Sequence, residues 1–326
     1  MRKFVHLNAR TIDEAVSALQ RYGAKASVIA GGTDLLGKMK DEILPTYPEA
    51  IINLKSIPGL DFIKEEEGML RIGALTRLEE IATNSLMHSK YRALAEAAHR
   101  TASPHIREMG TIGGNICQDI RCWYYRNPYN RFPCLRKGGG RCYAIEGDNR
   151  YHSIFDSSVK GGCLAVHPSD TAPALIVLNA VVKTSKRLIH ADDFFEVDVA
   201  KTTILERDEI VIEIQVQALA ADTKSSFVKF ATRKTIDFPI VNCAAMMTTS
   251  NGKVSAARIC LNAVYVKPYR ALKAEETIRG KVIDETAAKA AGDAAVLDVK
   301  PLRHNGYMVQ IARTMVKRAI LACKQS

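Results

Sequence analysis

The 326-residue chain contains no long uninterrupted run of apolar residues. No run approaches the ~18 residues that a membrane-spanning helix needs, and the first residues, MRKFVHLNARTIDEAV, contain no apolar region of the kind found in secretory signals. We therefore expect a cytoplasmic protein without a membrane span. That compartment keeps thiols reduced, so clustered cysteines in this chain favour metal or redox chemistry over disulfides.

Motifs for nucleic-acid binding are also absent. The formal net charge of +11 would suit nucleic acid, acidic protein subunits or anionic cofactors. However, the sequence has no zinc-finger spacing, no RNP-like motif and no dense basic helix, so we expect no nucleic-acid partner. The remaining composition, 47% hydrophobic and 25% charged, is that of an ordinary globular protein, and the length suits two or three domains.

Helical and strand patterns alternate along the chain. Thr11 and Glu14 form a capping box that opens a helix ending at Gly23, and Asn251-Gly252 between two apolar runs predicts a β-hairpin. We expect strands at 26–30, 51–54, 70–75, 225–233, 243–250 and 253–261, and further helices at 78–84, 90–100, 171–178, 285–295 and 305–324. A boundary after residue 178 divides the chain into predicted domains 1–178 and 179–326.

Two glycine turns predict a site for a dinucleotide. Neither Gly31-Gly32-Thr33 nor Gly113-Gly114 belongs to a Walker A loop or a G-x-G-x-x-G fingerprint. Glycines still let backbone amides approach a ligand closely, and amides at such a turn form a cradle for anions. Two turns, each with a hydroxyl residue nearby, would hold the two phosphates of one dinucleotide, with Thr111 and Asn115 adding hydrogen bonds. A single Gly-Gly pair is more often only a turn.

Four stretches in a fixed order resemble a known family. AGGTDLL (30–36), TIGGN (111–115), HPSD (167–170) and the stretch from Lys229 to Pro239 resemble the FAD-binding medium subunit of the molybdenum hydroxylases, the xanthine dehydrogenase and carbon monoxide dehydrogenase family. The resemblance covers nearly the whole chain. It implies an α+β protein, with a vanillyl-alcohol-oxidase-type FAD-binding domain of two α/β parts followed by a C-terminal domain of one sheet with helices.

The resemblance also implies which residues contact FAD. Asp170 has an alternative role as the N-cap of the helix that follows it, and Lys229 has an alternative as an exposed strand lysine. The residues expected at the pyrophosphate are Ala30, Gly31, Gly32, Thr33, Asp34, Leu35, Leu36, Thr111, Ile112, Gly113, Gly114 and Asn115, and those expected toward the flavin are Ser103, Asp170, Ile210 and Lys229.

A cysteine segment, residues 118–163, interrupts the FAD-binding domain. It resembles the inserted [4Fe–4S] loop of the 4-hydroxybenzoyl-CoA reductase and bacterial aldehyde oxidoreductase types, whose ligands match Cys122, Cys134, Cys142 and Cys163. Seven basic residues against two acids between 121 and 150 would stabilise an anionic thiolate cluster. Zinc and plain free thiols are the alternatives. Structural zinc usually takes cysteines two to four residues apart, a spacing that these four do not have.

The other cysteines have no expected role as ligands. Cys243 and Cys260 fit small buried hydrophobes, and Cys323 lies in the predicted terminal helix. Cys117 follows the second glycine turn closely, so we expect its backbone to be fixed by that turn and its side chain to pack inward. Cys163 ends the cysteine segment and is expected to complete the cluster in preference to Cys117.

The function implied by the resemblance is electron transfer. FAD exchanges two electrons while iron–sulfur centres pass one at a time, so the subunit would couple the two regimes. The implied partners are a molybdopterin-binding large subunit and a small subunit with two [2Fe–2S] clusters, in a heterotrimer or a dimer of heterotrimers, with the substrate site on another chain. The alternatives are a stand-alone FAD oxidoreductase that uses NAD(P)H and a non-catalytic iron–sulfur scaffold subunit.

Overall fold

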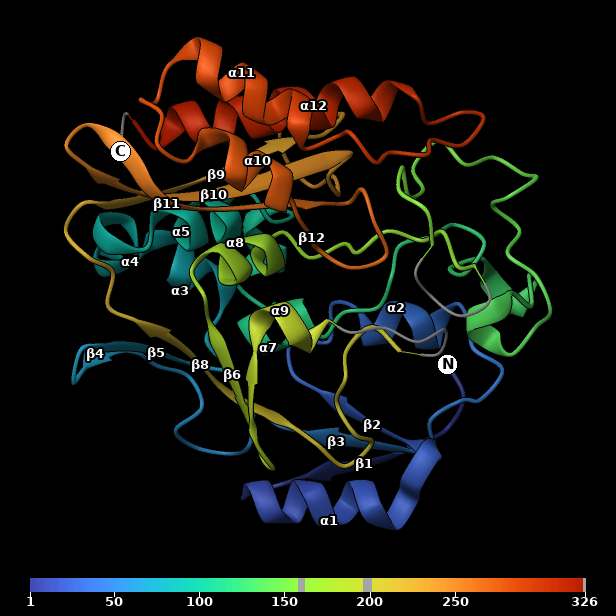
Figure 1. The fold of residues 1–326 in the computed structure, drawn as a ribbon. Coiled ribbons are helices and arrows are strands. Elements are labelled where there is room, and N and C mark those ends of the chain that lie inside the picture. Colours follow the sequence, from blue (N-terminus) through green and yellow to red (C-terminus); the bar gives the residue numbers. More distant parts are fainter. Residues whose placement is uncertain (158–161, 196–200, 325–326) are drawn as a thin grey trace.

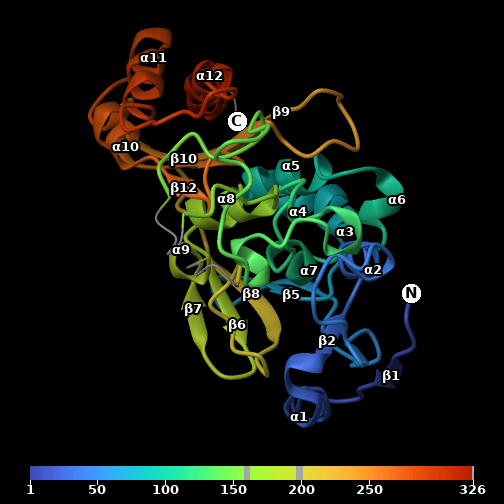
Figure 2. The same ribbon diagram turned by 90° about the vertical axis from the view of Figure 1, so that its right-hand side faces the viewer.

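The structure, a computed structural model, describes residues 1–157, 162–195 and 201–324. Three sheets follow one another from the bottom to the top of Figure 1, and α10, α11 and α12 form the outermost layer. The view in Figure 2, turned by a quarter, shows the same succession. The chain therefore combines helices and sheets in layers, in agreement with the mixed fold that the sequence predicts.

The first sheet is parallel, with strand order β1-β3-β2. Helix α1 crosses between its strands and begins at Thr11, whose hydroxyl accepts the Glu14 N–H at 3.1 Å, as the capping box predicts. The Glu14 carboxylate accepts the N–H of Arg10 rather than that of Thr11. The helix ends at Gly23, where φ is +55°. The elements are β1 (Val5–Asn8), α1 (Ile12–Tyr22), β2 (Ala26–Ile29), α2 (Leu35–Lys40) and β3 (Ala50–Asn53).

The second sheet is antiparallel, with strand order β4-β5-β8-β6-β7. Its helices bury an apolar cluster that includes Leu94, Leu175 and Ile214. The predicted boundary after residue 178 falls within the span of this sheet, because strands up to Gln217 pair with the strand at Met69–Gly73. The elements are β4 (Ile63–Glu66), β5 (Met69–Gly73), α3 (Leu78–Thr83), α4 (Ser85–Lys90), α5 (Arg92–His99), α6 (Pro104–Arg107), α7 (Ile112–Ile116), α8 (Thr171–Val177), β6 (Val181–Thr184), β7 (Leu188–His190), α9 (Ala191–Phe194) and β8 (Val211–Gln217).

The third sheet is antiparallel, with strand order β12-β11-β10-β9, and lies between two layers of helices. Helix α12 packs on β9 and β10, while α5 packs on β9 and α8 on β11. The predicted hairpin joins β10 to β11, with φ positive at both Asn251 and Gly252. Cys243 and Cys260 are buried here as expected, and Cys323, just after α12, is buried as well. The elements are β9 (Thr223–Phe230), β10 (Val241–Ser250), β11 (Lys253–Asn262), β12 (Tyr269–Arg270), α10 (Leu272–Ile278), α11 (Glu285–Ala294) and α12 (Tyr307–Ala322).

The cysteine segment has little regular structure. Its described residues form two short 3-10 helices, Pro128–Asn130 and Leu135–Lys137, within the irregular green loops to the right in Figure 1. Within the described ranges, no helix combines the length and the apolar character that crossing a membrane requires.

Candidate functional site

A cleft of about 550 Å³ brings together segments that are far apart in the sequence. Its lining comes from the turn after β2, the turn that opens α7, the segment before β8 and the loop between β9 and β10. Of the sixteen residues expected at FAD, those that line the cleft are Ala30, Gly31, Gly32, Thr33, Asp34, Leu35, Thr111, Gly113, Gly114, Asn115, Asp170 and Ile210. Leu36, Ser103, Ile112 and Lys229 do not line it.

The two glycine turns are packed directly against one another. A Cβ on Gly31 would lie 2.0 Å from the carbonyl oxygen of Met109, in the segment just before the second turn. Gly32 has φ of +74°, a conformation that residues with a side chain rarely adopt. The first turn therefore requires both glycines, one for close backbone packing and the other for its backbone conformation.

The second turn is shaped by its own hydroxyl residue and by the strand behind it. The Thr111 hydroxyl accepts the Gly114 N–H at 3.1 Å and so caps α7. Gly113 packs on β5, since its Cβ would lie 2.8 Å from the carbonyl oxygen of Ala74. Asn115 Oδ1 accepts the hydroxyls of Ser169 and Thr171, which fixes the amide against the start of α8. Gly114 is exposed to the cleft.

Asp170 and Lys229 form a buried ion pair beside the cleft. Lys229 Nζ donates to Asp170 Oδ2 at 2.7 Å, and both side chains are less than 5% exposed. Asn242 also donates to the Asp170 carboxylate, at 2.6 Å. Burial raises the pKa of Asp170, and the charge of Lys229 opposes that rise. Asp170 makes no side-chain capping bond and Lys229 is not an exposed strand lysine, so neither alternative role describes the structure.

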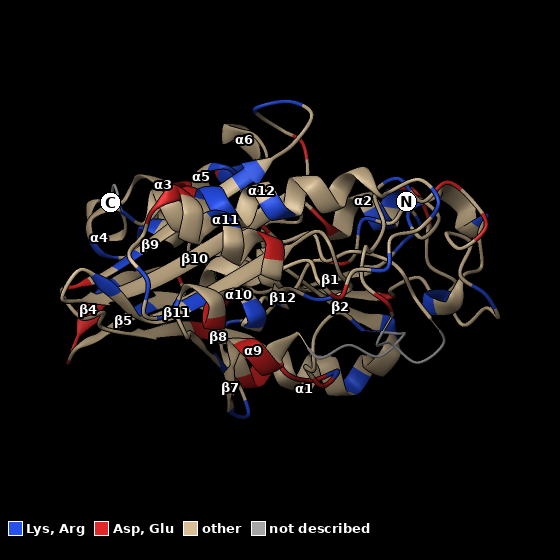
Figure 3. Cartoon of the chain, turned by 45° about the horizontal axis from the view of Figure 1, so that its top comes forward, with Lys and Arg blue, Asp and Glu red and all other residues tan. Residues whose placement is uncertain are grey.

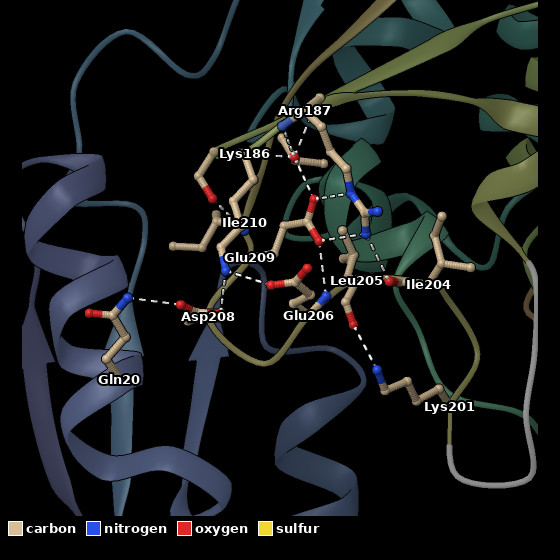
Figure 4. A network of polar contacts seen from close by, with 12 residues as sticks. Gln20, Lys186, Arg187, Lys201, Ile204, Leu205, Glu206, Asp208, Glu209 and Ile210 are labelled. Atoms are coloured by element: carbon tan, nitrogen blue, oxygen red, sulfur yellow. Dashed lines mark hydrogen bonds and ion pairs between the residues drawn. The ribbon is translucent and has the colours of Figure 1, made fainter.

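A set of polar contacts supports the cleft wall at Glu209 and Ile210 (Figure 4). The buried Glu209 carboxylate pairs with Arg187 at 3.0 Å and accepts the Thr184 hydroxyl at 2.7 Å. Ile210 N donates to the hydroxyl of Ser185 at 3.1 Å. The turn between β6 and β7 therefore fixes the backbone of the segment that precedes β8.

Several residues of the cleft were not predicted as site residues. Arg121 lines the cleft and its guanidinium lies 4.6 Å from the ring centre of Phe238, which lines it too. Lys38 of α2 completes this set. The sequence offered two weak signals, because Arg121 belongs to the basic cysteine segment and Phe238 to the stretch that ends at Pro239.

Cys117 differs from its expected placement. The prediction that its side chain packs inward is wrong, because Cys117 lines the cleft and is exposed there. The residue lies just past the last turn of the short α7, whose backbone directs the side chain toward the cleft rather than into the core.

Asp34 joins the first glycine turn to the cysteine segment. Its carboxylate lies 2.8 Å from a guanidinium nitrogen of Arg121 and 2.8 Å from one of Arg126, and it accepts the N–H of Asp119 at 3.0 Å. Burial raises the pKa of Asp34, but the charges of Arg126, Lys38 and Arg121 outweigh burial and leave that pKa below its usual value. Asp34 is therefore a carboxylate whose charge is balanced mainly by the neighbouring segment.

A second, small cavity is lined by all four cysteines that the sequence singled out. Cys122, Cys134, Cys142 and Cys163 line it together, although 40 residues lie between the first and the last. Its free volume is about 20 Å³. Among the described residues, no three side chains of His, Cys, Asp or Glu converge closely enough to hold a single metal ion. Cys117 is not part of this lining.

Nitrogen donors and cations surround the four thiols. Arg136 Nε lies 3.3 Å from Cys163 Sγ, and His152 Nε2 lies 3.3 Å from Cys122 Sγ. Burial raises the pKa of Cys122 to about 12, against the effect of the backbone amides of Tyr125 and Tyr124, which bond to its sulfur. In the part of the chain that the structure describes, Arg136 Nη2 and Lys137 Nζ are buried without a hydrogen-bond partner. Cationic nitrogens of Arg136 and Lys137 therefore lie in or beside the cavity of the four sulfurs.

Comparison with known families identifies both parts of the chain. Residues 2–217 match the FAD binding domain in molybdopterin dehydrogenase, and residues 226–323 match the CO dehydrogenase flavoprotein C-terminal domain. The chain is 30% identical over 324 residues to the carbon monoxide dehydrogenase medium chain of Hydrogenophaga pseudoflava, covering 98% of this chain and 96% of that one. It is 31% identical over 325 residues to the FAD-binding subunit of an aldehyde oxidoreductase of Escherichia coli, covering 96% of each.

Solved structures show the same fold. A structure of carbon monoxide dehydrogenase from Hydrogenophaga pseudoflava matches with a TM-score of 0.78 at 29% sequence identity, over 99% of this chain and 98% of that chain. The chain thus matches two domain families, and it matches relatives along nearly their whole length. The cleft between its two glycine turns is consistent with an FAD-binding domain. The chain therefore belongs to the family of FAD-binding medium subunits of the molybdenum hydroxylases, and it is a subunit of an oxidoreductase.

Proposed function

We propose that this chain is the electron-transfer subunit of a molybdopterin-dependent hydroxylase or dehydrogenase, and that it carries both FAD and one [4Fe–4S] cluster. The observation that carries the proposal is the presence of two adjoining sites, a cleft between two glycine turns and a cavity lined by four cysteines. The segment from Asp119 to Arg126 contributes to both sites.

FAD would lie in the 550 Å³ cleft, with its pyrophosphate at the two glycine turns. The exposed Gly114 and the positive φ of Gly32 leave backbone groups open to a close approach. The Asp170–Lys229 pair lies at the end of the cleft formed by α8, where the resemblance places the flavin. This arrangement supports the assignment of the domain to the vanillyl-alcohol-oxidase type.

An iron–sulfur cluster fits the chemistry of the cysteine cavity. Four thiolates and the inorganic sulfides of a cluster carry negative charge, which the buried Arg136 and Lys137 would balance. Zinc fits less well, because four sulfurs around one zinc ion lie roughly 3.8 Å apart, as Zn–S bonds of about 2.3 Å require. No such convergence exists among the described residues. With a free volume of about 20 Å³, the cavity would widen to admit the larger cluster.

The flavin would supply the step between two-electron and one-electron transfer. The substrate would react on another subunit, since two relatives that match along their whole length are named as a medium chain and an FAD-binding subunit. We propose a molybdopterin-binding large subunit and a [2Fe–2S] small subunit as partners, in a heterotrimer or a dimer of heterotrimers. Figure 3 shows Lys and Arg on α12 and around α2, which would suit acidic partner surfaces.

The test is the cofactor content of the natively purified protein. We expect FAD, about four iron and four sulfide per chain, and two co-purifying subunits. Cys163→Ser should abolish or degrade the EPR signal of the reduced cluster and weaken FAD retention, while Cys117→Ser should leave the iron content unchanged. Loss of iron in Cys117→Ser, with unchanged iron in Cys163→Ser, would contradict the assignment of the cluster ligands. Flavin without partner chains would favour a stand-alone oxidoreductase, and iron without flavin a scaffold subunit.

A further inference from the structure

The residues that balance the charge of Asp34 lie in the cysteine segment rather than in the glycine turn. Arg121 and Arg126 each place a guanidinium nitrogen 2.8 Å from Asp34 Oδ1, and Asp119 N donates to Asp34 Oδ2 at 3.0 Å. Lys38, on the same helix as Asp34, is more distant, at 3.8 Å. These side chains are mostly buried, with Asp34 17% exposed. We refer to Asp34, Lys38, Asp119, Arg121 and Arg126 as the Asp34 network.

The same segment forms one wall of the cysteine cavity. Arg126 N donates to the carbonyl oxygen of Cys122 at 2.8 Å, and Arg126 Nε donates to that of Ile120 at 2.8 Å. Ile120 and Tyr125 line the cavity beside Cys122. The hydroxyl of Tyr125 donates to the carboxylate of Asp119. Residues 119–126 therefore connect Cys122 to Asp34 of the first glycine turn through a set of hydrogen bonds.

Because Asp34 lies in the cleft, this connection affects how strongly the cleft binds an anionic ligand. Asp34 lines the cleft where the pyrophosphate of FAD would lie. Two negative groups that share a poorly solvated site repel one another unless cations neutralise them. Arg121 and Arg126 supply that neutralisation only while the cysteine segment holds its place. If residues 119–126 moved away, the Asp34 carboxylate would face the pyrophosphate with Lys38 alone to balance it.

Bonds from four cysteines to a cluster would add order to the cysteine segment. Its described residues contain two short 3-10 helices and no α-helix or β-strand. Binding of a metal centre by thiolates from distant positions contributes directly to the folding of such a segment. Loss of the cluster would release Cys122 and, with it, the adjacent arginines.

We propose that the Asp34 network couples occupancy of the cysteine site to the affinity for FAD. The cluster holds Arg121 and Arg126 against Asp34, and FAD binds more weakly once the cluster is removed. This inference rests on the proposed function. Because coupling between the binding free energies of two sites is reciprocal, bound FAD also strengthens the binding of the cluster by the same factor.

The test measures FAD dissociation from the full-length chain, isolated with its co-purifying subunits, before and after the iron is removed by oxidation and chelation. Flavin fluorescence reports the release. In the unaltered protein we expect removal of the cluster to weaken FAD binding about 10-fold, within the range typical of coupled sites. In Asp34→Asn, removal of the cluster should weaken FAD binding only about 2-fold or less, because the variant has no carboxylate charge at position 34 to repel the pyrophosphate.

Two arginine variants separate the network from general effects of charge. Arg126→Gln with its cluster intact should lose FAD about as readily as the unaltered protein without a cluster. Arg131→Gln removes the same charge from an exposed position in the same segment and should keep the 10-fold ratio. Equal FAD affinity with and without the cluster would overturn the inference, and so would a full ratio retained in Asp34→Asn. A preparation that lacks iron or FAD from the start would instead contradict the proposed function, and the inference with it.

Discussion

The cleft between the two glycine turns and the cysteine cavity adjoin one another but are built in different ways. The cleft is framed by ends of regular elements, and its two turns are locked by backbone packing such as that of Gly31 on Met109. The cysteine cavity is framed by loops and by one single-turn 3-10 helix, Leu135–Lys137. The first site is formed by the fold itself, whereas the second gathers its donors without a sheet or an α-helix to hold them.

This difference predicts how much a substitution in each site changes the free energy of unfolding. In the cleft, an added Cβ on either glycine turn meets backbone atoms that are closely packed and have little freedom to move. In the cysteine segment, a local shift among the described residues disturbs no sheet and no α-helix, so we expect it to cost less. Substitutions in the two regions should therefore separate effects on global unfolding from effects on cofactor content. Four predictions follow this order, from the largest expected effect to the smallest.

Asp170→Asn should produce the largest loss of stability. The change leaves Lys229 buried without its charge partner, which typically costs about 3 to 5 kcal/mol. Urea unfolding of the full chain measures the loss, and flavin release should accelerate in parallel. Asp156→Asn is the matched control, since the Asp156–Lys300 pair is about 70% exposed and should give no measurable change. Similar stability of the two variants would contradict the structural role of the buried pair.

Gly31→Ala should disturb both the fold and FAD binding. The added Cβ would meet backbone oxygen at 2.0 Å, so the two glycine turns would have to separate, at a cost of about 3 kcal/mol. Thermal unfolding and flavin content measure the two effects. Gly37→Ala, in α2 with open space around it, should leave both unchanged or slightly improved. Full flavin retention in Gly31→Ala would show that the turns do not act as a pair.

His167 lies in sequence between the two sites and should make stability depend on pH. Burial, and then the charge of Arg136, lower its pKa from 6.5 to about 3. The unfolded chain therefore binds the proton more readily, so stability is lost as pH falls from 6.5 toward 3, by about 1.4 kcal/mol per pH unit. His167→Gln should flatten this slope in urea unfolding between pH 6.5 and 5. The exposed His99→Gln should not.

Gly139→Ala should have the smallest effect on global unfolding and a clear effect on iron. Its Cβ would lie 1.8 Å from the carbonyl oxygen of Pro133, a conflict as severe as that at Gly31. Here the conflict lies next to Cys134 in a loop, which should shift rather than unfold the protein. We expect reduced iron content with an almost unchanged unfolding midpoint. An unfolding loss equal to that of Gly31→Ala would remove the distinction between the two regions.

Much of the fold was predictable from the sequence because local rules agreed with tertiary packing. The capping box at Thr11 and the Asn251-Gly252 hairpin occur where short-range chemistry predicts them. The grouping of β6, β7 and β8 with β5 was not predicted, because strand pairing across more than a hundred residues leaves no local signal.

The candidate sites were predicted unevenly for the same reason. The four cysteines that line one cavity were found from their types and from the resemblance. The orientation of the Cys117 side chain and the contact of Arg121 with Asp34 depend on the tertiary fold. The spacing of these residues in the sequence does not determine either of them. Arg121, whose partner Asp34 lies far away in the sequence, therefore escaped prediction.

The buried pair of Asp170 and Lys229 has a consequence for how the protein is synthesised. Asp170 precedes α8, whereas Lys229 belongs to β9 and Asn242 to β10, so the flavin end of the cleft draws on both matched families. On the ribosome, the N-terminal two thirds of the chain would emerge with Asp170 still lacking both partners. The polar contacts of Asp170 are therefore complete only after β10 has left the exit tunnel, and we expect FAD to bind late in synthesis.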